Sequence, residues 1–227
     1  MDKIFKFDHM NSVLQKFCSE HWCEFILFHS KTISVSAGNS IFSAGEDTLG
    51  IHILNKGKAK VVACTGIGTD RIIRLAAEDD ILGHRGFGGP WKYTVSAIAL
   101  EDSELLFIPI DIFNAAFKSN PDFAYYMLMF FAEELRESER LATQLPIKNV
   151  IASVLYNNLQ VFGFEKDSST KLSHTLSRKD LASQAGTRYE TLVRTLAELN
   201  NENIIKLEGK AIHILDIEKL VLLKEGN

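Results

Sequence analysis

The 227-residue sequence predicts an α+β protein with three parts: an antiparallel β domain, a long helix and a C-terminal winged helix-turn-helix. Three observations support this prediction. Short apolar runs separated by Gly, Asn and Asp turns fill about residues 20–110, which is typical of an antiparallel barrel, roll or sandwich. A long helical pattern starts at Pro121. Two short helical patterns and two short strand patterns then lie between Leu172 and Asp216.

Composition and charge limit the possible functions. Hydrophobic residues make up 46% of the chain and charged residues 24%, as in ordinary soluble globular proteins. The formal net charge of −4 argues against a generic polyanion binder, so any nucleic-acid contact must come from a local basic surface. No apolar run approaches the roughly 18 residues of a membrane helix, and no signal-peptide core precedes the β domain. We therefore expect a cytoplasmic protein without a membrane partner.

The N-terminal third combines one helix with a series of strands. Residues 11–29 predict a helix, because Leu14, Phe17, Cys18 and Phe25 recur near helical spacing. The apolar period then shortens to that of strands, with turn residues between the runs. Strands are predicted at residues 32–36, 51–54, 58–62, 72–75, 95–99 and 104–108.

The pattern that follows Pro121 predicts one helix of more than twenty residues. Proline is accepted in the first turn of a helix. The helix carries more aromatic side chains than a small barrel is expected to bury, so we expect a partner helix and a symmetric homodimer. A helix packed along its own domain is the alternative. The apolar residues concerned are Phe123, Tyr126, Met127, Phe130, Phe131, Leu135, Leu141 and Leu145.

Pro146 is expected to end this helix and to start the last part of the chain. Ile147 to Phe162 predicts a further amphipathic helix, and residues 163–174 form a polar connector. We place the boundary between Leu145 and Lys148. The predicted parts are thus a β domain at 1–120, a dimerisation helix at 121–145 and a winged helix-turn-helix domain at 146–227.

The first helix of the helix-turn-helix is predicted at Arg178 to Ala185. Ser177 is expected to cap its N-terminus, with Asp180 three residues later in a pairing that resembles a capping box. Gly186 then supplies the permissive backbone that a tight turn between two helices needs.

The second helix is predicted from Arg188 to about Asn201, with Thr187 as its cap and Glu190 three residues on. Its leucines share one face and are expected to pack inward, while polar residues occupy the first turns, as in a recognition helix that enters the major groove. Strands at residues 204–208 and 211–215 around Gly209 are expected to form the wing. The inward leucines are Leu192, Leu196 and Leu199.

These residue types suit contact with double-stranded DNA. Arginine pairs with guanine O6 and N7, and glutamate accepts from cytosine N4. Basic residues beside the first helix suit phosphate contact. A helix-turn-helix used only for protein contact is the alternative. The candidate DNA-contacting residues are Arg178, Lys179, Thr187, Arg188, Tyr189, Glu190 and Arg194.

Two other classes of protein are less well supported. An enzyme would need a recognisable reaction motif, and the sequence contains no Gly-rich phosphate loop, no HExxH and no nucleophile elbow. A nucleotide-gated regulatory subunit would not need a winged helix.

The chain resembles the CRP/FNR superfamily of bacterial transcription regulators over nearly its whole length. Gly186 to Arg194 is similar to the family's recognition-helix motif, whose base-contacting Glu and Arg correspond to Glu190 and Arg194. Residues 41–46 and 51–57 resemble its cyclic-nucleotide-binding β-roll. The resemblance implies a β-roll, a dimer helix and a winged helix, in which effector binding reorients the two recognition helices. It also implies a palindromic DNA site and RNA polymerase as a partner.

The resemblance also implies an effector cassette between Leu82 and Ala97. A Gly-Glu pair for the ribose and an Arg-Ser/Thr pair for the cyclic phosphate are expected there. Gly83 matches, but the other two main ligands do not, so we expect that the effector is not a standard cyclic nucleotide. A cyclic-nucleotide-responsive regulator, another small ligand, or a pocket closed by Phe87 and Trp91 are the alternatives. The candidate residues are Gly83, His84 in the Glu position, Tyr93 in the Arg position, Thr94 after it, and Arg85 and Lys92 as cations in non-matching places.

The sequence assigns no metal or cofactor, and the effector is unknown. Cys18, Cys23 and Cys64 are one thiolate short of an iron–sulfur cubane, and a disulfide framework is not expected from three cysteines. Cys18 and Cys23 are expected to be small buried hydrophobes. A redox sensor, or a haem sensor that uses a histidine such as His84, stays an alternative within the same family.

Overall fold

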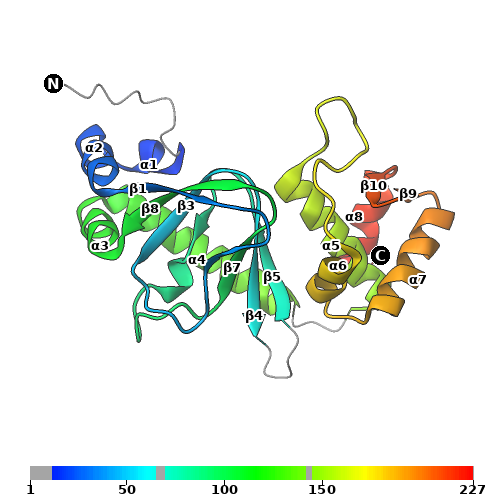
Figure 1. Cartoon of the computed structure of the whole chain (residues 1–227). Coiled ribbons are helices and arrows are strands. Elements are labelled where there is room, and N and C mark those ends of the chain that lie inside the picture. Colours follow the sequence, from blue (N-terminus) through cyan, green and yellow to red (C-terminus); the bar gives the residue numbers. More distant parts are fainter. Residues whose placement is uncertain (1–11, 65–69, 142–144, 227) are drawn as a thin grey trace. The chain divides into compact units, whose positions relative to one another are not determined.

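The computed structural model describes residues 12–64, 70–141 and 145–226, and the chain forms two compact units (Figure 1). The first unit consists of residues 1–62 and 76–142, and the second of residues 63–75 and 143–227. No helix within the described ranges is both long enough and apolar enough to cross a membrane.

Two short helices begin the described chain, where the sequence predicted one. α1 (Ser12–Phe17) and α2 (Glu20–His29) are separated because Ser19 is extended, with ψ at 156°. The backbone N–H of Ser19 donates to Asn120 Oδ1 at 3.4 Å, which anchors the break to the end of α3 (Ile110–Ser119). The prediction of a single helix over residues 11–29 is therefore wrong in its continuity.

Two four-stranded sheets form the β-roll, all of whose strands lie in the first unit apart from most of β5 and the end of β4 (Figure 1). All six predicted strands are present within one or two residues, and the predicted α+β fold with an antiparallel β-roll is confirmed. β2 and β6 were not predicted. One sheet has the order β1 (Lys31–Val35), β8 (Ser103–Pro109), β3 (Gly50–Lys56), β6 (Ile81–Leu82), and the other has the order β2 (Ser40–Phe42), β7 (Ser96–Ala99), β4 (Ala59–Cys64), β5 (Asp70–Ala76).

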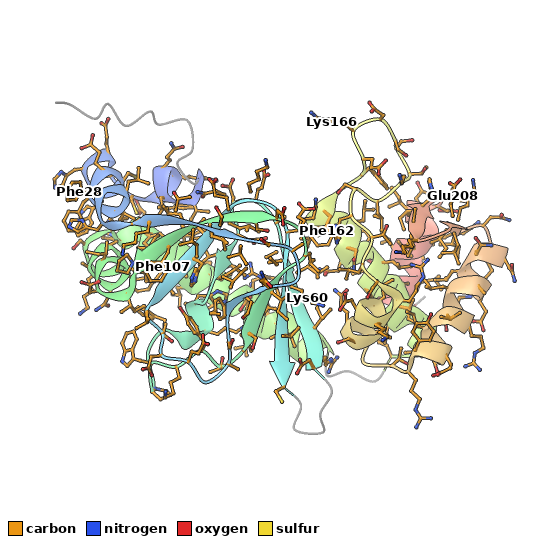
Figure 2. The ribbon with its side chains drawn as sticks, in the orientation of Figure 1. Phe28, Lys60, Phe107, Phe162, Lys166 and Glu208 are labelled. Carbon is orange, nitrogen blue, oxygen red and sulfur yellow. The ribbon has the colours of Figure 1, made fainter. Side chains whose placement is uncertain are left out.

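β3 is a central strand of its sheet and is buried from Gly50 to Leu54. Its neighbours place His52 opposite Phe107 on β8 and opposite Leu82 on β6 (Figure 2 labels Phe107). A continuous apolar strand is expected where both faces of a sheet are covered. Because β3 is held on both sides, its side chains that face the interior of the roll, such as His52, have fixed positions.

α4 (Pro121–Leu141) packs against α1 and α3 in its own unit. Phe123 and Met127 are fully buried, and Phe130 and Phe131 pack against the same apolar core. Tyr126 stacks on Phe17 with 4.4 Å between the ring centroids. α1, α2 and α3 provide part of the surface that a bare barrel would lack, so these aromatics are partly packed within their own unit, and the partner helix stays a prediction. The side chain of Leu141 lies outside the described residues.

The second unit is a helical domain with a small wing. α5 and α6 have their predicted bounds, and the wing strands differ from the prediction by one residue. The elements are α5 (Ile147–Phe162), α6 (Arg178–Ala185), α7 (Tyr189–Asn201), β9 (Ile205–Glu208), β10 (Ala211–Ile214) and the unpredicted α8 (Ile217–Glu225).

Candidate nucleic-acid interface and effector site

α6 begins with the predicted cap. Ser177 Oγ accepts from the backbone N–H of Asp180 at 3.1 Å and donates to Asp180 Oδ2 at 3.0 Å. Leu181, Ala182 and Ala185 are buried, which fixes the helix against the domain. Gly186 follows in the left-handed conformation, with φ at 63°, which β-carbon-bearing residues adopt at a cost.

α7 starts one residue later than predicted. Its N-cap is Arg188, in an extended conformation and without a side-chain cap bond, so the prediction that Thr187 caps this helix is wrong. The helix end is held by packing instead. Its buried side chains are Leu192, Thr195, Leu196 and Leu199.

The opposite face of α7 is open to solvent at its start. Tyr189, Glu190, Val193 and Arg194 are all exposed, and their spacing puts them on neighbouring positions of one face. The Arg194 side chain is 72% exposed, and its Nε lies 4.0 Å from Glu198 Oε1, a weak ion pair. This face presents a cation, a carboxylate and a phenol with little internal engagement, as base recognition requires.

Basic residues of α6 lie beside that face. Lys179 is exposed, whereas Arg178 is half-buried. Burial lowers the pKa of Arg178, and the nearby Tyr189 opposes this shift. The interaction places the start of α6 near the start of α7, so that a phosphate-binding cation and the recognition face belong to one surface.

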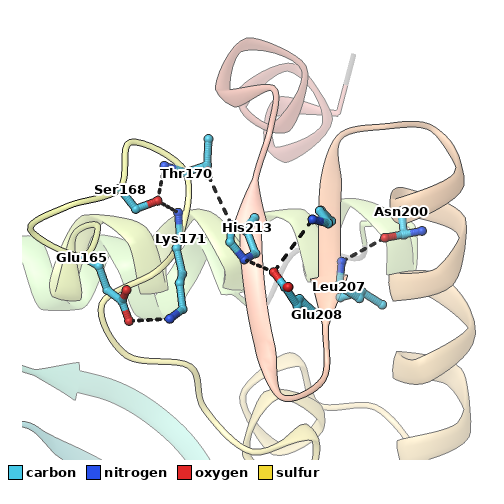
Figure 3. A network of polar contacts seen from close by, with 9 residues as sticks. Glu165, Ser168, Thr170, Lys171, Asn200, Leu207, Glu208 and His213 are labelled. Atoms are coloured by element: carbon cyan, nitrogen blue, oxygen red, sulfur yellow. Dashed lines mark hydrogen bonds and ion pairs between the residues drawn. The ribbon is translucent and has the colours of Figure 1, made fainter.

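The wing includes a third segment besides its two strands, because the connector between α5 and α6 forms backbone hydrogen bonds with β10. Leu172 donates its backbone N–H to Ile212, and Ile214 donates to Thr170. His213 lies between the two segments, with Nδ1 at 3.3 Å from Thr170 Oγ1 and Nε2 at 3.2 Å from Glu208 Oε2 (Figure 3). Sequence reasoning missed this third segment, since its contacts depend on a partner forty residues away.

Two of the candidate effector residues, His84 and Arg85, turn toward α4. Gly83 is left-handed, with φ at 87°, and leads into the 3-10 turn His84–Gly86. His84 is buried and points toward α4, where its Nε2 lies 2.8 Å from Glu134 Oε2. Arg85 Nε donates to the same oxygen at 3.1 Å. The Glu position of the cassette is therefore used for a contact with α4.

The remaining candidates differ in exposure. Lys92 is exposed and bonded to Asp47 Oδ1 at 2.8 Å, and Thr94 is exposed. Trp91 is also exposed, and Phe87 packs against Phe113 and Phe117 of α3. The ring of Trp91 meets that of Phe87 edge-on, with 5.3 Å between centroids, so the alternative in which these two side chains fill the pocket stays open. Tyr93 is the buried member of the group.

Two buried polar residues near Tyr93 escaped the sequence analysis. His52 Nδ1 and Thr48 Oγ1 are buried and have no hydrogen-bond partner within the described part of the chain. A β carbon on Gly83 would lie 3.6 Å from His52 Nδ1 and 3.0 Å from Tyr93 Cε1, so these groups adjoin. Burial lowers the pKa of His52 from 6.5 to about 4. The imidazole is thus neutral near pH 7.

This burial predicts a specific pH dependence of stability. The unfolded chain takes up a proton at position 52 below pH 6.5, whereas the folded chain does so only near pH 4. Stability from this site is therefore complete above pH 6.5 and is lost as the pH falls to 4, by about 3 kcal/mol. We expect His52→Phe to remove that loss in urea unfolding series. His21→Phe, at an exposed position, is the control, and an unchanged pH dependence in His52→Phe would contradict the prediction.

The cysteines are not arranged as a cluster site. Cys18 and Cys23 are buried, as expected, and Cys64 is exposed. Burial raises the pKa of Cys18 to about 12, and the neighbouring Cys23 adds to the shift. Burial also raises the pKa of Cys23. Thiolates are the metal-binding form, so both groups are poor ligands. Within the described ranges, no three His, Cys, Asp or Glu side chains are grouped as a metal site.

The face of α4 that does not pack on its own unit carries exposed apolar side chains beside the charged Glu133 and Arg136. Leu128 and Leu135 are each 62% exposed, and Tyr125 and Met129 are also exposed. Their spacing of three, four and seven residues places these four side chains on one stripe. We call them the α4 stripe.

Comparisons with known proteins agree with this geometry. Residues 32–120 match the family model of the cyclic nucleotide-binding domain, and residues 151–223 match that of the Crp-like helix-turn-helix domain. A CRP-like cAMP-activated global transcriptional regulator of Mycobacterium tuberculosis is 24% identical over 186 residues, 81% of this chain and 83% of the relative. The transcriptional activator protein anr of Pseudomonas aeruginosa is 24% identical over 192 residues, 83% of this chain and 78% of the relative.

A solved structure shows the same fold. It is a CRP/FNR-family transcriptional regulator from Thermus thermophilus, which is 25% identical and superposes with a TM-score of 0.69 over 86% of this chain and 98% of that one.

Proposed function

Because this chain belongs to the CRP/FNR family of transcription regulators, we propose that it binds a palindromic site in double-stranded DNA as a homodimer. The observation that supports this most directly is the exposed N-terminal face of α7. A two-fold pair of such helices reaches two half-sites in successive major grooves. In this proposal residues 1–120 form the regulatory β-roll domain, residues 121–145 the dimerisation helix and residues 146–227 the DNA-binding domain.

Within the DNA-binding domain, Glu190 and Arg194 recognise bases. They lie one turn apart on the open face of α7, and their groups match cytosine N4 and guanine O6/N7. The other five candidates position the domain on the backbone or at the groove edge. These residues are Arg178, Lys179, Thr187, Arg188 and Tyr189.

The α4 stripe is the proposed dimer seam. Exposed apolar side chains at this spacing are costly on an isolated helix and fit a parallel or antiparallel partner helix. The same stripe on a second copy provides a self-complementary partner, as a two-fold axis requires.

Further parts of the proposal follow from the family. We expect the protein to work in the cytoplasm, to have no catalytic activity and to contact RNA polymerase at its promoters. Its relatives in the comparisons are named as regulators and activators of transcription.

The decisive experiment is a selection of duplexes from a random pool, followed by titration of the selected site. We expect a palindrome with half-sites about one helical turn apart. Its affinity should fall as salt is raised, with a log–log slope that reflects the number of neutralised phosphates. No selected sequence, or affinity that ignores salt, would overturn the DNA-binding function.

We also propose that the β-roll does not take a standard cyclic nucleotide. A cyclic phosphate needs a charged partner when buried, and both nearby cations are engaged, Arg85 by Glu134 and Lys92 by Asp47.

This proposal gives a direct calorimetric prediction. Titration with cAMP and with cGMP should produce no binding heat at low-micromolar concentrations, because the arginine of the loop, Arg85, already pairs with Glu134. The cAMP-activated relative from Mycobacterium tuberculosis is the positive control under the same conditions. Low-micromolar binding to this chain would contradict the proposal.

A further inference from the structure

The side chain of Tyr93 is built into the interior of the β-roll. It is 5% exposed, its hydroxyl donates to the Gly50 carbonyl at 2.7 Å, and its ring stacks on Phe42 with 4.1 Å between centroids. The backbone is held as well, since its N–H donates to the Glu46 carbonyl at 2.9 Å. Tyr93 is therefore fixed at three places.

The loop of residues 83–86 closes tightly on that ring. A β carbon on Gly83 would lie 3.0 Å from Tyr93 Cε1, and one on Gly86 would lie 3.1 Å from Cδ1. Contacts at this distance are closer than ordinary packing, and a β carbon on Gly86 would also collide with Thr48 Oγ1, so the ring and Thr48 together leave no room for side chains at these two positions. Nothing larger fits between the ring and the loop unless one of them moves.

The same loop is fastened to α4 on its other side. His84 and Arg85 share Glu134 Oε2, at 2.8 and 3.1 Å, and the Glu134 side chain is only 15% exposed. The His84 ring also meets Phe130 and Phe131 edge-on, at 4.9 and 5.5 Å. The loop is thus held between a filled interior and the helix that carries the α4 stripe.

We propose that Tyr93 is an internal ligand of the β-roll. Its ring and hydroxyl occupy the place beside loop 83–86 where the family's cassette would hold an effector, and the contact of His84 with Glu134 joins that loop to α4. The roll then keeps its DNA-binding form without a small molecule. This inference rests on the proposed function and replaces the effector-sensing role that the sequence predicts for the roll.

The rival occupant is a small polar molecule that displaces Tyr93. It would find His52 Nδ1 and Thr48 Oγ1, two buried groups at the edge of the ring, as partners. Such a molecule would have to break the hydroxyl bond to Gly50 and the stack on Phe42. Because the hydroxyl is already bonded to Gly50 and the ring already stacks on Phe42, we favour the internal ligand, and the experiments below distinguish the two.

The first experiment removes any carried-over small molecule. The full-length protein is unfolded in guanidinium, desalted, refolded and titrated with the selected palindrome. We expect its affinity to stay within about twofold of the untreated protein. A loss that a small-molecule extract restores would overturn the proposal in favour of the rival. Failure to bind any duplex before treatment would instead contradict the proposed function.

The second experiment deletes the Tyr93 side chain by mutation and then supplies the same ring as a free small molecule. Tyr93→Ala should bind 4-methylphenol, the side chain that it lacks, in calorimetry, whereas the wild type should not. DNA affinity of the variant should fall by about tenfold and recover with 4-methylphenol. Tyr93→Phe, which keeps the ring, is the control and should stay close to the wild type. Binding of DNA by Tyr93→Ala with wild-type affinity would contradict the proposal.

The third experiment tests the link to α4. Glu134→Gln removes the charge shared by His84 and Arg85, and we expect DNA affinity to fall by about fivefold while the dimer persists in sedimentation. Glu133→Gln is the matched control, because Glu133 is exposed and pairs with Arg136 within α4. Equal DNA affinities of Glu134→Gln and Glu133→Gln would show that the contact between loop 83–86 and α4 does not affect DNA binding.

Discussion

Replacing Arg194 by alanine should abolish sequence-specific DNA binding and leave the fold intact. The side chain is 72% exposed, so its removal creates no cavity and breaks only a weak ion pair with Glu198. A bidentate pair with guanine contributes about 1–3 kcal/mol of discrimination, and a homodimer loses two of them, about 2–6 kcal/mol in all. The measurement is fluorescence anisotropy of the selected palindrome and of a scrambled duplex, over a salt series.

Two other variants make the result specific. Glu198→Ala, one turn further along α7, is the matched control and should bind as the wild type does. Lys179→Ala should weaken both duplexes alike and reduce the salt slope by about one for each phosphate that is no longer neutralised. If Arg194→Ala weakened both duplexes equally, Arg194 would bind a phosphate and the assignment of base recognition would fail.

Introducing a charge into the α4 stripe should convert the protein to monomers. Leu128→Lys places an ammonium in the middle of a seam whose other members are Tyr125, Met129 and Leu135. Burying two such charges across a two-fold axis is unfavourable, so the dimer dissociates. Affinity for the palindrome should fall by about 100-fold or more, because the second half-site no longer binds at a high effective concentration.

Sedimentation equilibrium measures the first effect and anisotropy the second. Phe28→Lys is the control, since Phe28 on α2 is 72% exposed and lies outside the stripe (Figure 2). A dimeric Leu128→Lys protein would place the seam elsewhere.

The sequence predicts most elements whose signals are local. α5 and α6 have the predicted bounds because Pro146, Ser177 and Gly186 mark their ends. β6 is only two residues long and has no alternation that a pattern could show. α3 follows β8 directly at Pro109, with no turn residue between them, so its apolar residues continue those of the strand.

The candidate sites show the same division. The open face of α7 follows from the 3.6-residue period alone, and the structure shows those residues exposed. The interior of the β-roll does not follow from any period. Tyr93 contacts Phe42 and Gly50, which lie about forty to fifty residues away in the sequence. Comparison with the family motif shows only that Tyr93 stands where an arginine is expected, and does not reveal these contacts.

The aromatic residues of α4 show where the sequence argument was incomplete. The helix does carry more apolar side chains than a roll would cover, but Phe123 is buried, and Tyr126, Phe130 and Phe131 pack partly against the core that α1, α2 and α3 share. The apolar side chains that stay exposed are those of the α4 stripe, on the other face. Helical periodicity could have distinguished the two faces if α3 had been predicted as the partner of the first.

The strand pairing beside the wing has a consequence for solubility. An exposed edge strand offers unpaired backbone groups to other chains, and short ribbons are prone to edge-to-edge aggregation. Here residues 170–172 cover the outer edge of β10, and β9 carries Lys206 and Glu208 at alternate positions. One edge is closed by the chain itself and the other bears charge of both signs. Many copies can therefore crowd along one DNA molecule without their wings joining into a common sheet.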